Sequence, residues 1–556
     1  MFITLRGPSA ADDSANEQIG VYERDDIGRC ILARTPFAAG EVLDRFSGEI
    51  GPELQQHSLQ VRPGMHISET RFIGFLTHGC DPNCRLDMDR FELVALHDIA
   101  AGELLTVDYA ATEDVLHRQF ECHCSARLCR GWITGRTEEI TEEGRLILAA
   151  RRPASAEASH WWAREDLHYR SGRLQFAGQD VAGLASRSGG PLYLYSLDRA
   201  EANLSRVLAA LEATGCEHDV YYAIKANRFR PLLERLAQSG RCGADICSPG
   251  ELDLALSCGF AASRVSFTGT GVSSRDLDRL LRFPELTINC DTIGMIRRIG
   301  ERCPGRHIGL RVNPGLGTGY DEAEKLTYAG SRTTKFGIYR EQWAEALDTA
   351  RRFGLRVTGL HFHVGCGYLN GQLENWDRAV AEAARFLDDL PDIETVNVGG
   401  GLGLPHRETD RPLDLSVWSE ILHRHFSGRG VRIAVEPGDY IAKDAGILIL
   451  SVTDVEWKRD TRFVYVNGGF NLHPEPAFYD LPCHPAACVL FEEAKEARET
   501  VTIAGNINEA LDIWAADIAM PPLSEGAFIA FLNAGGYGSA MSSNHCLRGN
   551  FEERAI

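Results

Sequence analysis

Between residues 191 and 438 the sequence alternates short apolar runs with longer amphipathic ones, and this pattern restricts the possible folds more than any other feature. PLYLYS precedes AEANLSRVLAALEAT, VYYAIKA precedes PLLERLAQSG, and RCGADIC precedes GELDLALSCG; the series continues with VSFTGT, LTINCD, IGLRVNP, LHFHVG, TVNVGGG and RIAVEPG. Short apolar runs bounded by turn residues are typical of buried parallel strands, and amphipathic runs are typical of covering helices. About eight or nine alternations over roughly 250 residues predict an α/β barrel of the TIM type.

Different patterns flank this segment, so the 556 residues predict a multidomain chain. Residues 1–136 form short β-rich stretches separated by tight turns, which predicts a small β-domain. Residues 137–164 are charged and then rich in Ala and Ser, as expected for a helix followed by a linker. We assign the barrel, with an entry strand, to 165–445, and the β-rich runs after it predict a C-terminal β-domain at 446–556.

Charge and hydropathy exclude several classes of protein. The formal net charge is −20, whereas a nucleic-acid surface needs clustered Lys and Arg. No apolar run reaches the roughly 18 residues that span a bilayer, and the N-terminus has no basic region followed by an apolar one. We therefore expect a cytoplasmic protein that binds neither nucleic acid nor a membrane and acts on a small molecule.

In a TIM-type barrel the chemistry takes place where strands end and loops begin. The predicted strand ends carry Lys225, Asp245, Arg311, His363, the Gly399-Gly400-Gly401 turn and Glu436. A lysine at the end of a buried strand is costly to desolvate unless it becomes neutral or covalently bound. The main chemical use of such a lysine is a Schiff base, above all with pyridoxal phosphate. For Lys225 alone, the alternative is a side chain that extends its ammonium to solvent.

The other strand-end residues suit the same cofactor. The triple glycine exposes backbone N–H groups, which bind phosphate well. Glu436 beside a pyridine nitrogen would keep that nitrogen protonated and make the ring a strong electron sink. His361 and His363 alternate onto one face of their strand. A metal site is one interpretation of this pair, but no third ligand is near, and we favour a histidine stacked on a ring.

Sixteen cysteines are spread over the chain, and only one cluster of them is dense. Cys122, Cys124 and Cys129 stand within eight residues, too close together for sensible disulfides. In a cytosolic chain such a cluster is typical of metal binding. Tetrahedral zinc needs a fourth ligand, for which Cys80 in HGCDPNC is the best candidate. We therefore predict a structural zinc site with four thiolates.

Three motifs stand out in the first unit: THGCDPNC at 77–84, GELLTVDY at 102–109, and the CxCxxxxC spacing at 122–129. Together they resemble a SET domain with its post-SET zinc knot, and the resemblance covers this unit only. The family consists of protein-lysine methyltransferases that use S-adenosylmethionine. The resemblance implies that Tyr109 is the active-site tyrosine and that the zinc ligands are Cys80, Cys122, Cys124 and Cys129.

Two positions depart from the SET pattern. The family's Asn-His-Ser-Cys reads THGC at 77–80, so the asparagine that binds the cofactor is absent. Its Gly-x-Gly reads GRC at 28–30, which puts a side chain where the backbone approaches the cofactor. Both departures argue against binding of S-adenosylmethionine. We favour a retained scaffold or docking role over an active methyltransferase, because a fold alone does not carry a function.

A series of motifs runs in order through residues 165–556: AIKAN, GADICSPGEL, RVNPG with KFGI, LHFHVGCG, GGGLG, EPGDY, NINEALD and NAGGYGSAMSSNH. Combined, they resemble the alanine-racemase-like (fold type III) pyridoxal-phosphate decarboxylases that act on ornithine, arginine and diaminopimelate. The resemblance implies that Lys225 forms the Schiff base, that His363 stacks on the ring, and that Glu436 pairs with the pyridine nitrogen. It assigns the phosphate to the glycines at 399–401 and Tyr537. It also implies a head-to-tail homodimer whose active sites take C-terminal residues from the neighbour.

Three positions depart from the decarboxylase pattern. Asn508 replaces the cysteine that protonates the substrate carbon after carbon dioxide leaves, which an amide cannot do, and Glu509 follows it. Asp439 replaces the arginine of Glu-Pro-Gly-Arg, and Cys366 replaces the usual serine after His-Val-Gly. We expect that a Cα bond is still broken. Reprotonation would use another acid, with three candidates: Cys483, His484 and His545.

These observations predict a pyridoxal-phosphate-dependent amino-acid decarboxylase. Glu509, with Asp439, suggests an amine-bearing substrate, because buried carboxylates need a cationic partner. An amino acid bound to a carrier protein is the alternative substrate. Other interpretations are non-decarboxylating chemistry at Cα (oxidative, racemising or eliminating), a methyltransferase with a secondary barrel, and a non-catalytic protein that binds pyridoxal phosphate. Glu436 and His363 argue against the last.

Overall fold

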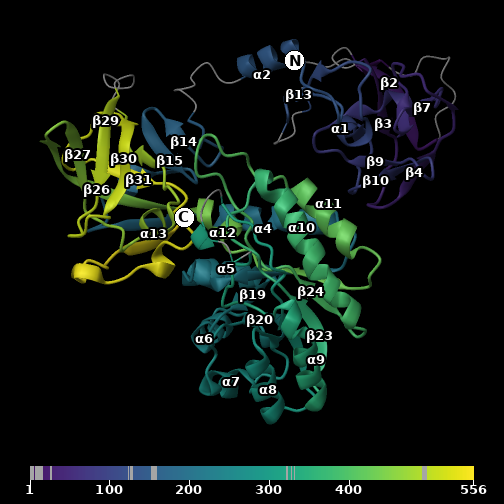
Figure 1. The fold of residues 1–556 in the computed structure, drawn as a ribbon. Helices are drawn as coiled ribbons and strands as arrows, with labels where there is room; N and C mark the ends of the chain where they lie inside the picture. Colours follow the sequence, from purple (N-terminus) through teal and green to yellow (C-terminus); the bar gives the residue numbers. More distant parts are fainter. Residues whose placement is uncertain are drawn as a thin grey trace. The chain divides into compact units, whose positions relative to one another are not determined.

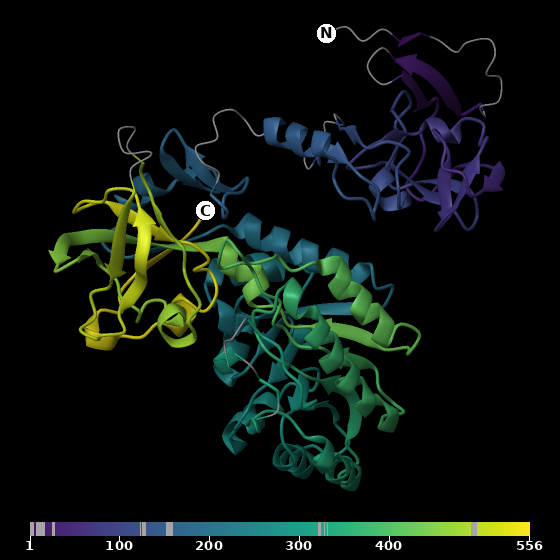
Figure 2. The same ribbon diagram turned by 45° about the horizontal axis from the view of Figure 1, so that its top comes forward.

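The computed structural model (Figures 1 and 2) describes residues 5–6, 17–24, 28–122, 124, 129–151, 160–320, 324–326, 328–330, 332–490 and 498–556. The chain forms two compact units, Met1–Ser159 and His160–Ile556. The predicted helix after residue 137 is present as α2 (Glu142–Arg151). The Ala- and Ser-rich linker that we expected after it, at 152–159, lies outside the described residues. Within the described part of the chain, no helix is both long and apolar enough to cross a membrane.

The first unit is β-rich, as predicted, and its strands are short. Its main strands are β2 (Ile19–Arg24), β3 (Gly28–Ala33), β4 (Val42–Arg45), β5 (Glu49–Gly51), β6 (Leu59–Arg62), β7 (Met65–Ser68), β8 (Thr77–His78), β9 (Cys84–Asp87), β10 (Glu92–Ala95), β11 (Thr106–Val107), β12 (Phe120–Glu121) and β13 (Trp132–Ile133). They form several small sheets, including the antiparallel sheets β4-β10-β9 and β5-β7-β6. The parallel pair of β8 and β11 brings His78 next to the short helix α1 (Tyr109–Thr112).

The second unit contains the predicted barrel. Eight parallel strands close on themselves: β18 (His218–Ala223), β19 (Gly243–Ile246), β20 (Val265–Thr268), β21 (Thr287–Cys290), β22 (His307–Arg311), β23 (Arg356–His361), β24 (Thr395–Asn397) and β25 (Arg432–Val435). The covering helices are α4 (Leu197–Glu212), α5 (Arg230–Ser239), α6 (Pro249–Ser257), α7 (Ser274–Leu280), α8 (Ile293–Arg302), α9 (Trp343–Arg352), α10 (Leu373–Ala384) and α11 (Leu415–Phe426). Figure 1 shows these helices around the strands. The fold class predicted from the alternation is therefore confirmed.

Local sequence signals set the starts of several barrel helices. Ser196, Ser248, Ser273 and Thr292 each accept a hydrogen bond from the backbone N–H three residues on, which caps α4, α6, α7 and α8. These caps fix where each loop ends and its helix begins. Because the eight strands are parallel in a closed barrel, their carboxyl ends and the loops that follow meet in one common region.

The C-terminal β-domain follows the barrel, as predicted. It is built on β26 (Gly446–Lys458), β27 (Thr461–Val466), β28 (Pro485–Ala487), β29 (Glu499–Ala504), β30 (Ile513–Met520) and β31 (Phe528–Phe531), and its short helix is α13 (Glu475–Tyr479). One sequence interpretation was wrong here. PLYLYS contains β17 (Leu192–Tyr195), which pairs with β26 and with β32 (Glu552–Ala555), and is not a barrel strand. Its residues are buried on both faces, so the hydrophobic pattern alone could not separate it from the barrel strands.

Candidate active site

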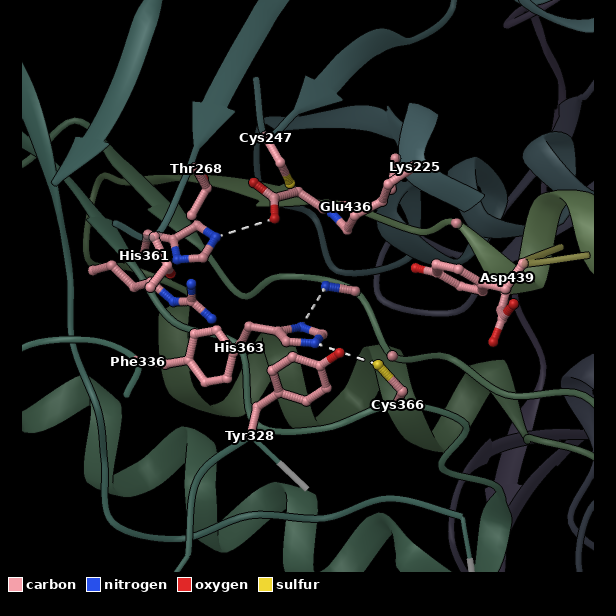
Figure 3. Close-up of a pocket in the computed structure, with 17 residues that line it drawn as sticks. Lys225, Cys247, Thr268, Tyr328, Phe336, His361, His363, Cys366, Glu436 and Asp439 are labelled. Atoms are coloured by element: carbon pink, nitrogen blue, oxygen red, sulfur yellow. Dashed lines mark hydrogen bonds and ion pairs between the residues drawn. The ribbon is translucent and has the colours of Figure 1, made fainter. Parts of the chain in front are cut away.

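A cavity of about 300 Å³ lies at the carboxyl ends of the barrel strands (Figure 3). Most of the residues predicted for the site line it: Lys225, Arg311, His363, Gly400, Gly401, Glu436 and Tyr537. Asp245 contacts Lys225 from the neighbouring strand, and Gly399 begins the glycine turn. The barrel therefore brings the predicted strand-end residues together in one place.

Lys225 follows β18 in a single turn of 3-10 helix, Ile224–Ala226. Its Nζ donates a hydrogen bond to Oδ2 of Asp245 at 2.5 Å; 40% of the Lys225 side chain is accessible, whereas that of Asp245 is fully buried. Burial lowers the pKa of the Lys225 ammonium, but the Asp245 carboxylate outweighs this effect and the pKa lies well above its usual value. The amine is thus held at the cavity wall by a carboxylate that no solvent reaches.

Glu436 follows β25 and is held from two sides. Oε2 accepts a hydrogen bond from Nε2 of His361 at 3.1 Å, and Oε1 accepts one from Nδ2 of Asn397 at 2.7 Å. Among the described residues, Nδ1 of His361 has no hydrogen-bond partner, which assigns the ring proton to Nε2. Burial raises the pKa of Glu436, but the His361 ring more than compensates and the pKa falls to about 2. The cavity therefore contains an ionised carboxylate in a fixed orientation.

The glycine turn is joined to the same network. Gly399 N–H donates to Oδ1 of Asn397 at 2.9 Å, and Glu436 N–H donates to the carbonyl of Gly399 at 2.8 Å. A Cβ on Gly400 would lie 2.2 Å from the Glu436 carbonyl oxygen, and one on Gly401 would lie 2.1 Å from that of Gly365. Glycine is therefore required at both positions, and the turn keeps its backbone at the cavity wall.

His363 presents a neutral ring to the cavity. Nδ1 accepts a hydrogen bond from Gly400 N–H at 3.3 Å, so the ring proton is assigned to Nε2, which lies 3.6 Å from Sγ of Cys366. Burial, aided by the positive charges of Arg311 and Lys225, lowers the pKa of His363 to about 3. Tyr328 packs edge-on against this ring, with centroids 4.8 Å apart (Figure 3).

Sequence reasoning missed part of this site. It grouped His361 with His363 and did not find that His361 binds Glu436, a residue 75 positions away. It also missed Asn397 and the cavity-lining Tyr328. A polar residue at the end of a buried strand, two positions before a glycine turn, was the available signal for Asn397.

Some predicted residues lie away from the cavity of their own chain. Asn508 and Glu509 are exposed on the loop between β29 and β30. Cys483 is 2% exposed in the core of the β-domain. His484 packs edge-on against Trp161, with centroids 5.4 Å apart, and burial lowers its pKa to about 4. His545 alone lies beside a predicted site residue, with Nε2 at 3.3 Å from Oε1 of Glu509.

The four cysteines predicted as zinc ligands come together in the first unit. The Sγ atoms of Cys80, Cys122, Cys124 and Cys129 all lie within 4.8 Å of one another. Cys80 and Cys122 have their sulfurs 3.8 Å apart, which is far beyond a disulfide bond of about 2.05 Å. It matches the edge of roughly 3.8 Å that four Zn–S bonds of about 2.3 Å give a tetrahedron. The group therefore has the ligand type and spacing of a four-thiolate metal site.

The SET-like unit carries Cys30 where the Gly-x-Gly pattern has its second glycine. Cys30 is fully buried in β3, and the Arg29 guanidinium lies 5.1 Å above the ring of Phe75. The Tyr109 hydroxyl donates a hydrogen bond to the carbonyl oxygen of Leu76, and Tyr109 lines a cavity of about 290 Å³ in this unit. The cavity wall includes neither Arg29 nor Cys30. Tyr109 as an active-site tyrosine thus stays a prediction.

Comparisons with known proteins find a match for each of the two units. Residues 197–443 match the pyridoxal binding domain of pyridoxal-dependent decarboxylases, and residues 28–110 match the SET domain. The diaminopimelate decarboxylase of Methanothermobacter thermautotrophicus is 31% identical over 391 residues, which cover 67% of this chain and 88% of that enzyme.

Two solved structures are similar to the second unit. Diaminopimelate decarboxylase from Helicobacter pylori, complexed with L-lysine, aligns with a TM-score of 0.62 at 26% identity and covers 67% of this chain and 93% of that one. The enzyme from M. jannaschii, also in complex with L-lysine, has a TM-score of 0.64 at 25% identity, with 70% and 93% covered.

A closed parallel barrel with a lysine, an ionised glutamate and a glycine turn at its carboxyl end, joined to a β-domain, defines a pyridoxal-phosphate enzyme of the alanine-racemase-like class. The relatives narrow this class further. The chain belongs to the pyridoxal-dependent decarboxylases, which are carboxy-lyases, and carries a SET domain in front of the decarboxylase part. The family resemblance seen in the sequence is confirmed.

Proposed function

We propose that this protein decarboxylates a free amino acid with a basic side chain. The Glu436 network carries the proposal, because an ionised carboxylate fixed by His361 and Asn397 faces the cavity that holds Lys225. A carboxylate in this role keeps a pyridine nitrogen protonated, which favours loss of carbon dioxide from Cα. The substrate class is supported by the relatives, which are named diaminopimelate decarboxylases, and by L-lysine in two of the similar structures.

The cavity residues fit pyridoxal phosphate. Lys225 would hold the aldehyde carbon as a Schiff base, and Glu436 would hold the pyridine nitrogen. Neutral His363 would lie against the ring, and the glycine turn with Tyr537 would bind the phosphate. Glycine at positions 400 and 401 keeps the backbone of the turn at the cavity wall, where backbone N–H groups would face the phosphate. Bound pyridoxal phosphate supplies the electron sink that allows the Cα–carboxylate bond to break.

Each protein group at the cavity has a defined task with respect to protons. Glu436, with a pKa of about 2, stays ionised across the physiological range, and its oxygens accept hydrogen bonds from His361 and Asn397. Asp245 stabilises the ammonium of Lys225 whenever that amine is free. His363 stays neutral, so its ring adds no positive charge against the bound cofactor. The buried Arg311 forms an ion pair with Asp291, with Nη1 and Oδ1 3.3 Å apart. The two charges of this pair cancel, so Arg311 adds no net charge to its side of the cavity.

A second copy of the chain completes the site in this proposal. Asn508 and Glu509 lie on an exposed loop, so they are free to enter the cavity of a head-to-tail partner. Asn508 cannot act as an acid, and Cys483 and His484 are enclosed within their own domain. His545, held beside Glu509, is therefore our choice for the acid that protonates Cα.

For the first unit we propose a structural zinc ion and a docking role. Cys80, Cys122, Cys124 and Cys129 would bind the zinc. His78 supports this arrangement, because Nδ1 accepts a hydrogen bond from Tyr109 N–H and Nε2, which then carries the proton, lies 3.3 Å from Sγ of Cys80. Such an N–H orients a thiolate ligand. The departures from the SET pattern at Cys30 and Thr77 argue against bound S-adenosylmethionine.

The experiment that tests the proposed activity is release of carbon dioxide from a panel of free basic, acidic and neutral amino acids by the protein loaded with pyridoxal phosphate. Lys225→Ala is the blank. We expect release from basic amino acids alone. Absence of release from every free amino acid, with normal cofactor binding, would contradict the proposal and leave a carrier-bound substrate as the remaining interpretation.

A further inference from the structure

A second cavity, of about 150 Å³, adjoins the cofactor cavity. The two share Tyr328, Cys366, Asp439 and Tyr537, so they have a common wall. The far side of the second cavity is formed in part by the helix α13, which contributes Glu475 and Tyr479. The second cavity thus lies next to the one that contains Lys225, and it offers room for the side chain of a substrate bound there.

Two carboxylates of this second cavity share one lysine. Nζ of Lys443 lies 3.2 Å from Oδ1 of Asp439 and 2.8 Å from Oε2 of Glu475. The side chain of Lys443 is 1% exposed, and those of Asp439 and Glu475 are 13% and 4% exposed. When both buried carboxylates are ionised, the single ammonium leaves one negative charge without a counter-charge. That deficit is met by a proton, as the raised pKa of Glu475 indicates, or by a further cation.

No other group at this cavity provides the missing positive charge, among the described residues. His406 lines it and His473 lies 3.7 Å from Glu475, and in both cases burial, followed by the Lys443 charge, lowers the pKa to about 3. Both rings are therefore neutral. Burial raises the pKa of Tyr479, which stays neutral too.

Both carboxylate oxygens of Glu475 contact the Lys443 ammonium. Oε1 accepts a hydrogen bond from Nζ at 3.1 Å, and Oε2 lies 2.8 Å from the same nitrogen. One ammonium therefore serves both oxygens of Glu475 and Asp439 as well.

We infer that this cavity is the subsite for the distal end of the substrate, that Asp439 and Glu475 select a primary ammonium there, and that they exclude a distal carboxylate. The inference rests on the proposed function, because it identifies which basic substrates the decarboxylase takes. A distal ammonium supplies the one positive charge that the cavity lacks. A distal carboxylate adds a third negative charge beside two that share a single lysine.

The sequence of this chain differs from the family pattern at the wall that the two cavities share. Its Asp439 stands where the family pattern Glu-Pro-Gly-Arg has a cation, so the wall common to both cavities has changed its sign of charge. Lys443, one helical turn further along, restores only one of the two charges needed.

The test uses calorimetric titrations of the full-length protein loaded with pyridoxal phosphate. It compares three ligands of similar length that share a primary amine at one end and differ at the other. Cadaverine ends in an ammonium, pentylamine ends in a methyl group, and 5-aminopentanoate ends in a carboxylate. We expect cadaverine to bind at least ~10-fold more tightly than pentylamine, and 5-aminopentanoate to bind most weakly. Equal affinities, or tightest binding of 5-aminopentanoate, would overturn the inference.

Two variants locate the effect. Glu475→Gln and Asp439→Asn should each reduce the preference for cadaverine over pentylamine at least ~5-fold while the affinity for pentylamine stays constant. Glu456→Gln is the matched control, because this glutamate pairs with Lys458 on an exposed part of the β-domain. An unchanged preference in both site variants would contradict the assignment. Binding of the diamine requires no decarboxylation, so failure of the proposed activity and failure of the subsite give different results.

Discussion

The two parts of the barrel site hold buried carboxylates in different ways. At the cofactor end, Glu436 accepts hydrogen bonds from His361 and Asn397, one on each oxygen, and no other carboxylate of the described residues shares these donors. At the substrate end, Asp439 and Glu475 share Lys443. A carboxylate with its own fixed donors remains charged and oriented toward a cofactor. Two carboxylates with one lysine need a further cation. The comparison supports our proposal that the chain keeps the family's cofactor site and differs from the family in the substrate that it accepts.

The strongest challenge to this comparison is removal of the shared lysine. Lys443→Met leaves two buried carboxylates without a counter-charge, and we expect it to lower the free energy of unfolding by about 3–5 kcal/mol. Denaturant or thermal unfolding measures the change. Lys458→Met, which breaks an exposed pair with Glu456, is the matched control and should cost less than about 1 kcal/mol. Equal losses in the two variants would show that Lys443 does not balance buried charge.

Removal of the charge at the cofactor end should affect catalysis more than folding. Glu436→Gln keeps the size of the side chain but cannot hold a pyridine nitrogen protonated. We expect kcat to fall by about 10²–10³-fold, the effect of losing one strong electrostatic contact at the reacting centre. Steady-state release of carbon dioxide measures this, with Glu420→Gln on the exposed face of α11 as control. A kcat within a factor of about two of the wild type would contradict the role of Glu436.

The contribution of the substrate end to folding stability should also depend on pH, through Glu475. Burial raises the pKa of Glu475 from its usual 4.5 to about 7. Between these values the folded protein binds more protons at this site than the unfolded chain does, so the contribution of Glu475 to stability decreases as pH rises. Glu475→Gln should remove that decrease. Unfolding at several pH values from 4.5 to 7.5 measures the difference between variant and wild type; a difference that does not change with pH would be the contrary result.

A smaller effect is expected from the acid that acts on Cα. If His545 of a second copy protonates this carbon, His545→Asn should slow release of carbon dioxide by roughly 10²-fold. His484→Asn should leave the rate nearly unchanged, since His484 packs against Trp161 and outside the cavity. Equal rates in the two variants would exclude His545.

The metal site that we propose for the first unit gives a prediction that is independent of the barrel. Cys124→Ser removes one of four thiolates, and we expect less than one zinc ion per chain together with earlier unfolding of the first unit alone. Elemental analysis and proteolysis measure both effects. Cys216→Ser, at a cysteine of the second unit outside the cluster, is the control. Full zinc content in Cys124→Ser would contradict the ligand assignment.

Sequence reasoning found the cofactor end much better than the substrate end, for a physical reason. Lys225, His363 and Glu436 each stand at the end of a barrel strand, and strand ends are visible in the hydrophobic pattern. The Lys443–Glu475 pair joins segments 32 residues apart in different domains, which no local pattern reveals. PLYLYS was misassigned because a strand buried on both faces looks the same in a barrel and in a β-domain. The choice among Cys483, His484 and His545 depends on which side chain is exposed, which only the packed structure decides.

The central claim is that the barrel decarboxylates a substrate whose far end is an ammonium without a carboxylate. Its most direct test compares release of carbon dioxide from L-lysine and from diaminopimelate by the same loaded protein, with Lys225→Ala as the blank. The two amino acids differ only in the distal carboxylate. The account predicts a kcat/KM for L-lysine at least ~10-fold above that for diaminopimelate. Equal or faster release from diaminopimelate would contradict it.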